Sequence, residues 1–178
     1  MTHPTELAPL IVSIMILLPA VVIDFRSRRI PNVLCVVGFL AGAGLHGLMT
    51  GWGGVAASCV AGVVVLAVMF PLFVIGWFGA GDVKLVAAMG AVAGSVTDAA
   101  AILATVFIAG GLLALLMSLY HRGPKQTFWN FHIPVNLVVV NRHTADCPDA
   151  SIPLVLPYSL AIAGGSVFVL TMNVFGAG

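Results

Sequence analysis

Six long apolar runs, separated by short polar segments, dominate the sequence. Only 7% of the 178 residues are charged, whereas a soluble domain carries roughly 25%. So few charges cannot cover a water-facing surface, which excludes a soluble globular domain, a disordered tail and a nucleic-acid-binding module. A membrane-crossing helix needs about 20 apolar residues, so six would use about 120. The sequence therefore predicts an all-α polytopic membrane protein with a single domain over residues 1–178.

The apolar runs predict a bundle of six transmembrane helices. The expected spans are residues 7–23, 33–49, 55–78, 83–94, 99–120 and 152–174. The fourth is the shortest, and its helix would reach only about 20 Å, against a hydrocarbon core of about 30 Å. It therefore starts inside the protein or lies where the bilayer is thinner. Asp98 is expected to cap the fifth helix, or to be a buried carboxylate if the boundaries are shifted.

The basic residues predict the orientation of the bundle. With the N-terminus outside, the inside segments are residues 24–32, 79–84 and a polar loop over 121–151. All seven basic residues fall in these segments: Arg26, Arg28, Arg29, Lys84, Arg122, Lys125 and Arg142. Short loops retain Lys and Arg on the cytoplasmic side, so these segments are expected to be cytoplasmic. The aromatic stretch 128–132 in the loop suits the membrane interface.

The cysteines give no sign of a metal site or a disulfide framework. Cys35, Cys59 and Cys147 are odd in number and widely spaced, and the sequence contains no Cys-x-x-Cys pair. No metal and no cofactor are therefore expected, and the lipid bilayer is the first partner that the composition implies.

Asp24 and Asp82 differ from the other acidic residues in their position. Both lie at ends of apolar runs that the predicted topology places on the cytoplasmic side, at the same depth. An ionisable group at such a position is costly and is a functional candidate. Two adjacent carboxyl groups resist double ionisation, so one keeps a proton while the other can activate a water. This pair predicts aspartic peptide hydrolysis, although a lone Asp at a membrane boundary is more often a helix cap or an interface anchor.

Glycines precede Asp82 and have a physical use there. Gly79 and Gly81 lack side chains, so an extended peptide backbone could approach Asp82 closely. A Gly-x-Gly-Asp sequence alone is weak support in a chain with 20 glycines. Lys84, two residues later, is by default an anchor that keeps its end of the helix inside.

Three sequence motifs, in order along the chain, resemble those of type IV prepilin peptidases. Residues 24–32 read Asp-Phe-Arg-Ser-Arg-Arg-Ile-Pro-Asn, which resembles the first-aspartate motif of that family. Residues 79–85 look like its second motif, Gly-x-Gly-Asp followed by an apolar residue, Lys and Leu. Residues 156–164 resemble a Pro-Tyr-x-x-Ala-Ile-x-x-Gly element of its last helix.

This resemblance implies a Gly-x-Gly-Asp aspartic endopeptidase of the bacterial inner membrane. Such an enzyme removes the short leader of a prepilin on the cytoplasmic side, with Asp24 and Asp82 as the catalytic pair. Because the chain is short and lacks cysteine pairs, it looks like the small tight-adherence class that processes Flp-type prepilins. The residues expected to bind substrate or shape the site are Gly79, Gly81, Lys84, Pro31, Asn32, Pro157 and Tyr158.

A small channel or proton-coupled transporter is the rival hypothesis. Asp24 and Asp82 would then be proton-relay groups, which explains paired carboxylates equally well. It does not explain the glycines before Asp82 or the Ile-Pro-Asn sequence that ends at Asn32. A non-catalytic subunit of a secretion complex is a third possibility, in which these motifs would be relics.

Overall fold

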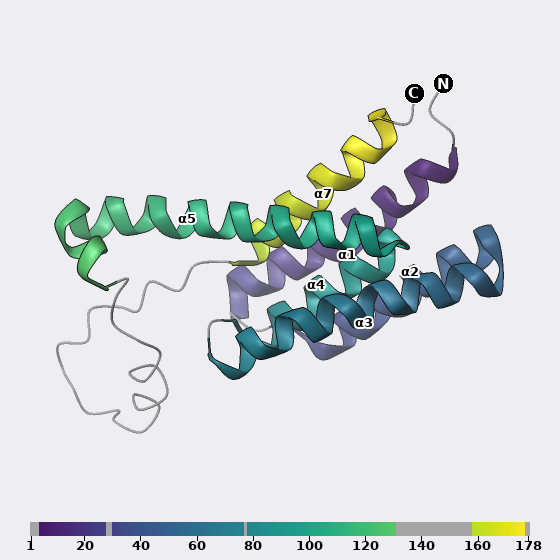
Figure 1. Cartoon of the computed structure of the whole chain (residues 1–178), viewed down its shortest axis with the longest axis horizontal. Helices are drawn as coiled ribbons and strands as arrows, with labels where there is room; N and C mark the ends of the chain where they lie inside the picture. Colours follow the sequence, from purple (N-terminus) through teal and green to yellow (C-terminus); the bar gives the residue numbers. More distant parts are fainter. Residues whose placement is uncertain (1–3, 28–29, 77, 131–157, 177–178) are drawn as a thin grey trace.

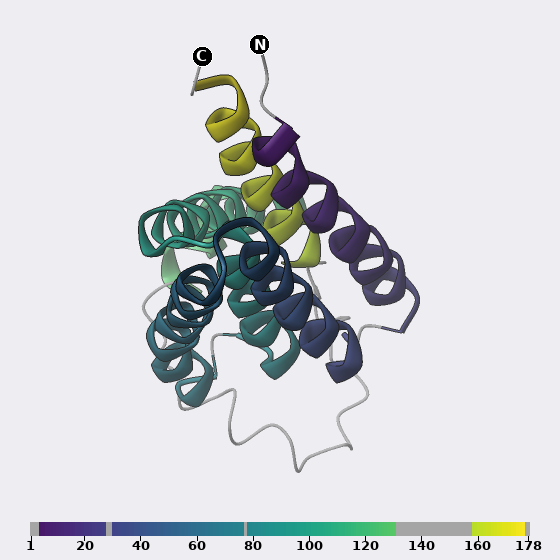
Figure 2. The ribbon, with the colours of Figure 1, turned by 90° about the vertical axis from the view of Figure 1, so that its right-hand side faces the viewer.

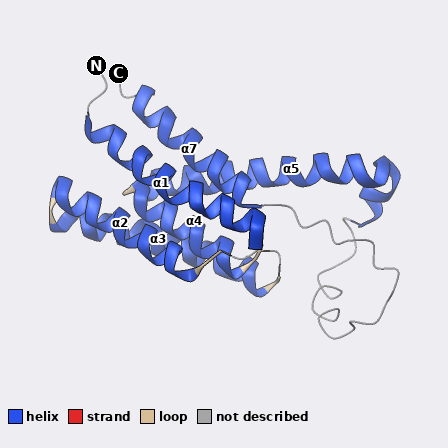
Figure 3. Ribbon diagram, turned by 180° about the vertical axis from the view of Figure 1, so that it is seen from behind, coloured by secondary structure: helices blue, strands red, loops and turns tan. Residues whose placement is uncertain are grey.

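The computed structural model describes residues 4–27, 30–76, 78–130 and 158–176, with the backbone alone for residues 4–6, 114, 117–130 and 176. This part of the chain is helical and contains no strand, which confirms the predicted all-α class (Figures 1 and 3). The helices are α1 (Pro4–Ser27), α2 (Asn32–Thr50), α3 (Trp52–Val74), α4 (Ala80–Ala93), α5 (Val96–Asn130) and α7 (Tyr158–Gly176).

Five helices form a closed ring around the sixth. Neighbours are in contact in the order α1, α2, α3, α5, α7 and back to α1, and α4 contacts all five of them. Figure 2 shows this arrangement nearly end-on. The shortest helix is therefore the centre of the bundle, and we call α4 the central helix.

The central helix is short because protein surrounds it. From Val83 to Ala93 every residue is buried except Lys84. A helix that is apolar on all sides is stable only inside a core, and such a helix does not need to match the thickness of a bilayer. Of the six predicted membrane-crossing helices, the five that surround α4 are long and apolar enough to cross a membrane, which confirms the prediction for them. These candidate spans are Leu7–Ser27, Asn32–Thr50, Trp52–Val74, Val96–Leu113 and Tyr158–Phe175.

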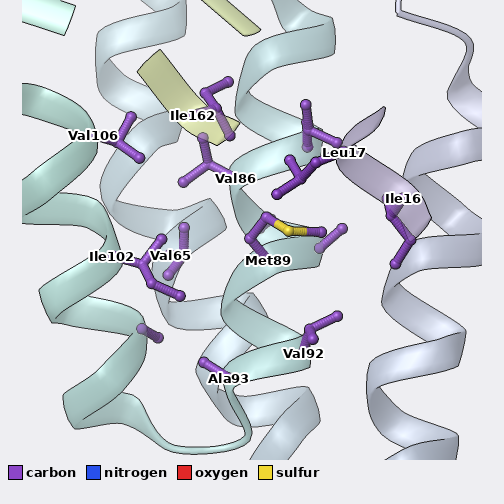
Figure 4. Close-up of a cluster of buried hydrophobic side chains, with 14 of the residues drawn as sticks. Ile16, Leu17, Val65, Val86, Met89, Val92, Ala93, Ile102, Val106 and Ile162 are labelled. Carbon is purple, nitrogen blue, oxygen red and sulfur yellow. The ribbon is translucent and has the colours of Figure 1, made fainter. Parts of the chain in front are cut away.

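Small residues let the ring approach the central helix closely. A methyl group added at Gly42 of α2 would lie 2.6 Å from the backbone nitrogen of Val92, so the two backbones are nearly in contact. Glycines at such crossings are typical of helix packing in membranes. Larger side chains fill the remaining space, and Figure 4 shows Ile16 of α1, Val65 of α3 and Ile162 of α7 among those that gather around α4.

The outer ring also supplies hydrogen bonds to the last turn of α4. The hydroxyl of Ser58 donates to the carbonyl of Ala91 at 2.6 Å, and Nε2 of His46 donates to the carbonyl of Val92 at 2.9 Å. Carbonyls at the end of a helix have no partner within that helix, so these donors from α2 and α3 satisfy them. Gly94, with φ at 76°, then ends the helix.

Two predicted helix ends differ from the structure. The third helix ends at Val74 rather than at residue 78, because Gly76 turns the chain with φ at 86°. The fifth helix continues to Asn130, so the predicted loop 121–151 is helical over its first ten residues (Figure 1). Hydropathy marks where an apolar run ends, and it does not mark where a helix ends, since α5 continues past the apolar run through Gly123 and Pro124. The rest of that loop and the predicted first residues of the last span, 152–157, lie outside the described residues.

Ser95, rather than Asp98, occupies the cap position of α5. Its hydroxyl oxygen accepts a hydrogen bond from the backbone N–H of Asp98 at 3.1 Å and donates to the Asp98 carboxylate at 2.7 Å. This reciprocal pair resembles a capping box. Asp98 is half-buried and is engaged in this cap.

We predict that Gly42→Ala destabilises the bundle by about 1–3 kcal/mol, because the new methyl group would meet the backbone of α4. Gly44→Ala on the same helix is the matched control, since a methyl group there meets nothing within 4 Å. Alanine favours helices over glycine, so the control should be neutral or slightly stabilising. Thermal unfolding in detergent, followed by circular dichroism, measures both. Equal stability of the two variants would contradict the close approach.

Candidate active site

The two candidate catalytic residues, Asp24 and Asp82, lie at the same end of the bundle. Asp24 belongs to the last turn of α1, which ends at Ser27, and Asp82 belongs to the first turn of α4. The end of α1 and the start of α4 both lie toward the left of Figure 1. Each of the two side chains is half-buried. The fold therefore brings two segments that are far apart in the sequence to one region.

Local helix geometry holds the side chain of Asp82. Gly79 is the cap residue of α4, with extended backbone angles, and its carbonyl accepts a hydrogen bond from the N–H of Val83 at 3.2 Å. The backbone N–H of Gly79 donates in return to the carboxylate of Asp82. An acidic residue at the third helical position reaches back to the cap in this way. The carboxyl group of Asp82 is thus fixed over the first turn of α4.

Asp82 ionises at a higher pH than an ordinary aspartic acid. Its pKa is raised to about 6, chiefly by burial and secondarily by the negative charge of Asp24, while the hydrogen bond from Gly79 acts in the opposite direction. Asp82 precedes the apolar part of α4 and lies outside the five candidate spans. The influence of Asp24 shows that the two carboxyl groups interact electrostatically. A carboxyl group beside another negative charge keeps its proton to a higher pH than an isolated carboxyl group does.

Ile30 and the first turn of α2 pack directly on the start of α4. A methyl group added at Gly81 would lie 3.1 Å from Cβ of Ile30, so this glycine makes room for the isoleucine. The ammonium group of Lys84 donates a hydrogen bond to the side-chain oxygen of Asn32 at 3.0 Å. The thiol of Cys35 points to the carbonyl of Gly81, with the sulfur 3.9 Å from the oxygen. These contacts join the first predicted motif to the second.

An aromatic cluster lies on another side of Asp82. The rings of Phe78 and Tyr158 meet edge-to-face with centroids 4.9 Å apart, and Phe107 packs on Phe78 at 5.7 Å. The hydroxyl of Tyr158 donates to the carbonyl of Val106 at 3.4 Å. Tyr158 is within electrostatic range of Asp82, so the cluster lies next to the carboxyl group. The first turn of α7 thereby contributes to the site.

Most of the predicted site residues gather around Asp82, and several neighbours were not predicted. Asn32, Gly79, Gly81, Lys84 and Tyr158 lie there as described above. Pro31 is exposed at the cap position of α2, and Pro157 lies outside the described residues.

The sequence reasoning missed Ile30, Cys35, Phe78 and Phe107. Phe78 could have been found, because it directly precedes the Gly-x-Gly-Asp motif. Phe107 lies within an apolar run that carries no further signal.

No group of three His, Cys, Asp or Glu side chains that could hold a metal ion occurs among the described residues. The chemistry that the site offers rests on its two carboxyl groups, which can move protons to and from a water and a carbonyl oxygen. The ammonium group of Lys84 and the phenol of Tyr158 lie nearby.

We predict that Asp24→Asn lowers the pKa of Asp82 below about 6, because a neutral amide replaces the charge that raises it. The pKa should stay above the ordinary value of 3.8, since burial is the larger cause. The infrared carbonyl band of protonated Asp82, identified by its loss in Asp82→Asn, measures the titration. Asp98→Asn is the control and should leave the titration unchanged. An unchanged pKa in Asp24→Asn would mean that the two carboxyl groups do not interact.

Comparison with known proteins identifies one matching family. The sequence model of the type IV leader peptidase family matches residues 11–119, which is more than half of the chain. The match includes both Asp24 and Asp82. No curated protein and no solved structure matches the chain significantly.

Proposed function

Because the chain belongs to the type IV leader peptidase family, we propose that it is an aspartic endopeptidase whose catalytic pair is Asp24 and Asp82. The observation that carries this proposal is that the fold brings the two motif carboxyl groups into electrostatic interaction, although they belong to different helices. The family match supports a peptidase in general. The electrostatic interaction between Asp24 and Asp82 supports these two residues as its reacting groups.

The pair can hydrolyse a peptide bond with its protons balanced. The ionised carboxylate takes a proton from a water, whose oxygen attacks the peptide carbonyl carbon, while the protonated carboxyl group donates its proton to the carbonyl oxygen. The resulting tetrahedral diol then loses a proton to one carboxylate as the other group protonates the amide nitrogen. The carbon–nitrogen bond breaks, releasing a carboxylic acid and an amine. The pair then again holds one proton.

The start of α4 supports the approach of an extended backbone. Gly79 is exposed and presents no side chain beside Asp82, and its missing Cβ would stand 3.0 Å from a carboxylate oxygen. A substrate backbone could therefore pass over Gly79 and reach Asp82 without meeting a side chain. The aromatic cluster of Phe78, Phe107 and Tyr158 also lies nearby, with Tyr158 within electrostatic range of Asp82. Gly81, by contrast, is filled by Ile30 and serves packing.

The proposed substrate is the leader of a prepilin of the Flp type, cleaved at the cytoplasmic face of the bacterial inner membrane. Three features support this: the family match, the distribution of the basic residues, and the lack of cysteine pairs in this sequence. Lys84 lies at the same end of the bundle as Asp24 and Asp82, so basic charge and the candidate site share one side. No cofactor is needed for this reaction.

We predict that Asp24→Asn and Asp82→Asn each abolish leader removal, because each variant removes one of the two proton-transferring groups. Co-expression with a candidate Flp-type prepilin, followed by the mass of the pilin on a gel, measures processing. Immunoblots of the membrane fraction establish that the variants still insert. Asp98→Asn, in the first turn of α5 at the other end of the bundle, is the matched control and should process normally. Continued processing by both Asn variants would overturn the proposal, and proton flux without cleavage would favour a relay function instead.

The proposed orientation has its own test. Reporter fusions at Ser27 and near Gly51 should report opposite sides of the membrane, with the fusion at Ser27 active in the cytoplasm. Alkaline phosphatase and green fluorescent protein fusions give complementary signals for the two sides. The reverse pattern would place the two carboxyl groups outside and contradict cytoplasmic cleavage.

A further inference from the structure

The structure assigns a positioning role to one hydrogen-bonded pair, Asn32 and Lys84, which clasps the segment after α1 to the start of the central helix. This inference rests on the proposed function and deepens it, because it states what keeps the end of α1 that carries Asp24 close to the start of α4. The ammonium nitrogen of Lys84 lies 3.0 Å from the side-chain oxygen of Asn32. The clasp thus joins the first residue of α2 to the second turn of α4, two residues beyond Asp82.

Helix stability does not account for a lysine at this place. Lys84 lies near the N-terminal end of α4, and its ammonium group is bonded at the N-terminal end of α2. Both ends carry partial positive charge, which disfavours a cation. Lys84 is also the one exposed residue in the otherwise buried stretch from Val83 to Ala93. A cation in an unfavourable field, bonded to a motif residue, indicates a role beyond helix formation.

The contacts around the clasp show what it positions. Ile30 fills the space over Gly81, and Asn32 follows two residues later with its bond to Lys84. These two contacts hold residues 30–32 against the start of α4. Their partners in α4, Gly81 and Lys84, lie before and after Asp82 in the sequence. Asp24 lies at the end of α1 that leads into this segment. Opening the clasp would allow the end of α1 to move away from α4, and a shift of about 1 Å can lower a reaction rate 100-fold.

In the proposed reaction neither Asn32 nor Lys84 touches the water or the substrate amide, so both are positioning residues. Asn32→Ala and Lys84→Ala are expected to lower kcat by about 10- to 100-fold while KM changes little. The double variant should lose no more than the worse single variant, because the same bond is removed in each. Asn32→Asp keeps an oxygen acceptor for Lys84 and should retain a kcat close to that of the unchanged protein.

The experiment combines kinetics with a readout that does not need activity. Full-length variants are assayed in detergent with a purified prepilin, with Thr50→Ala as the matched control. Thr50 is an exposed polar residue at the opposite end of α2, and its hydroxyl donates to the carbonyl of His46 in its own helix. Separately, cysteines replace Asp24 and Asp82 in a chain whose three native cysteines are removed. A short bifunctional thiol reagent then measures how often the two positions meet.

The clasp is supported if kcat losses are non-additive and if Asn32→Ala lowers cross-linking several-fold while Thr50→Ala does not. It is overturned by additive losses, by a change confined to KM, or by unchanged cross-linking in Asn32→Ala. The two arms also separate this inference from the proposed function. If Asp24→Asn and Asp82→Asn still cleave prepilin, the catalytic proposal fails, whereas the cross-linking result still decides whether Asn32 and Lys84 hold the two helices together.

Discussion

The structure depends on the enclosure of a helix that could not be stable elsewhere. The central helix is too short to cross a bilayer and too apolar to face water, so it requires protein on every side. The closed order of α1, α2, α3, α5 and α7 provides this. Glycine at position 42 allows the backbones to approach, while Ser58 and His46 satisfy the carbonyls of its last turn. The ring and its centre therefore stabilise one another.

This enclosure also determines how the site is built. Because the ring holds α4 on all sides, Asp82 in its first turn has a fixed position relative to the neighbouring helix ends. Burial there raises the pKa of Asp82, and Gly79 orients its carboxyl group. Asp24 comes from a ring helix, so its approach to Asp82 depends on how the residues between α1 and α2 pack on α4, chiefly on the contact of Ile30 with Gly81. One carboxyl group thus belongs to the rigid centre and the other to the frame around it.

The sequence predicts much of this arrangement and fails where a contact has no local signature. Apolar runs indicate five helices well, because their length and composition are set by the membrane. They misplace the ends of α3 and α5, since a turn at Gly76 and a helical continuation to Asn130 are independent of hydropathy. The motifs identify Asp24 and Asp82 as candidates. Phe107 is invisible in the sequence, because its contact with Phe78 joins residues from different helices.

The chain order of the helices has a consequence for the assembly of the protein in the membrane. During synthesis α4 follows α1, α2 and α3, but the ring closes only when α5 and α7 have also been inserted. A 14-residue segment is too short for the insertion machinery to treat as an independent span. The central helix must therefore be held against α2 and α3 until its last neighbours arrive. Folding of this protein is consequently completed from its C-terminal end, after the segment that carries Asp82 has already been made.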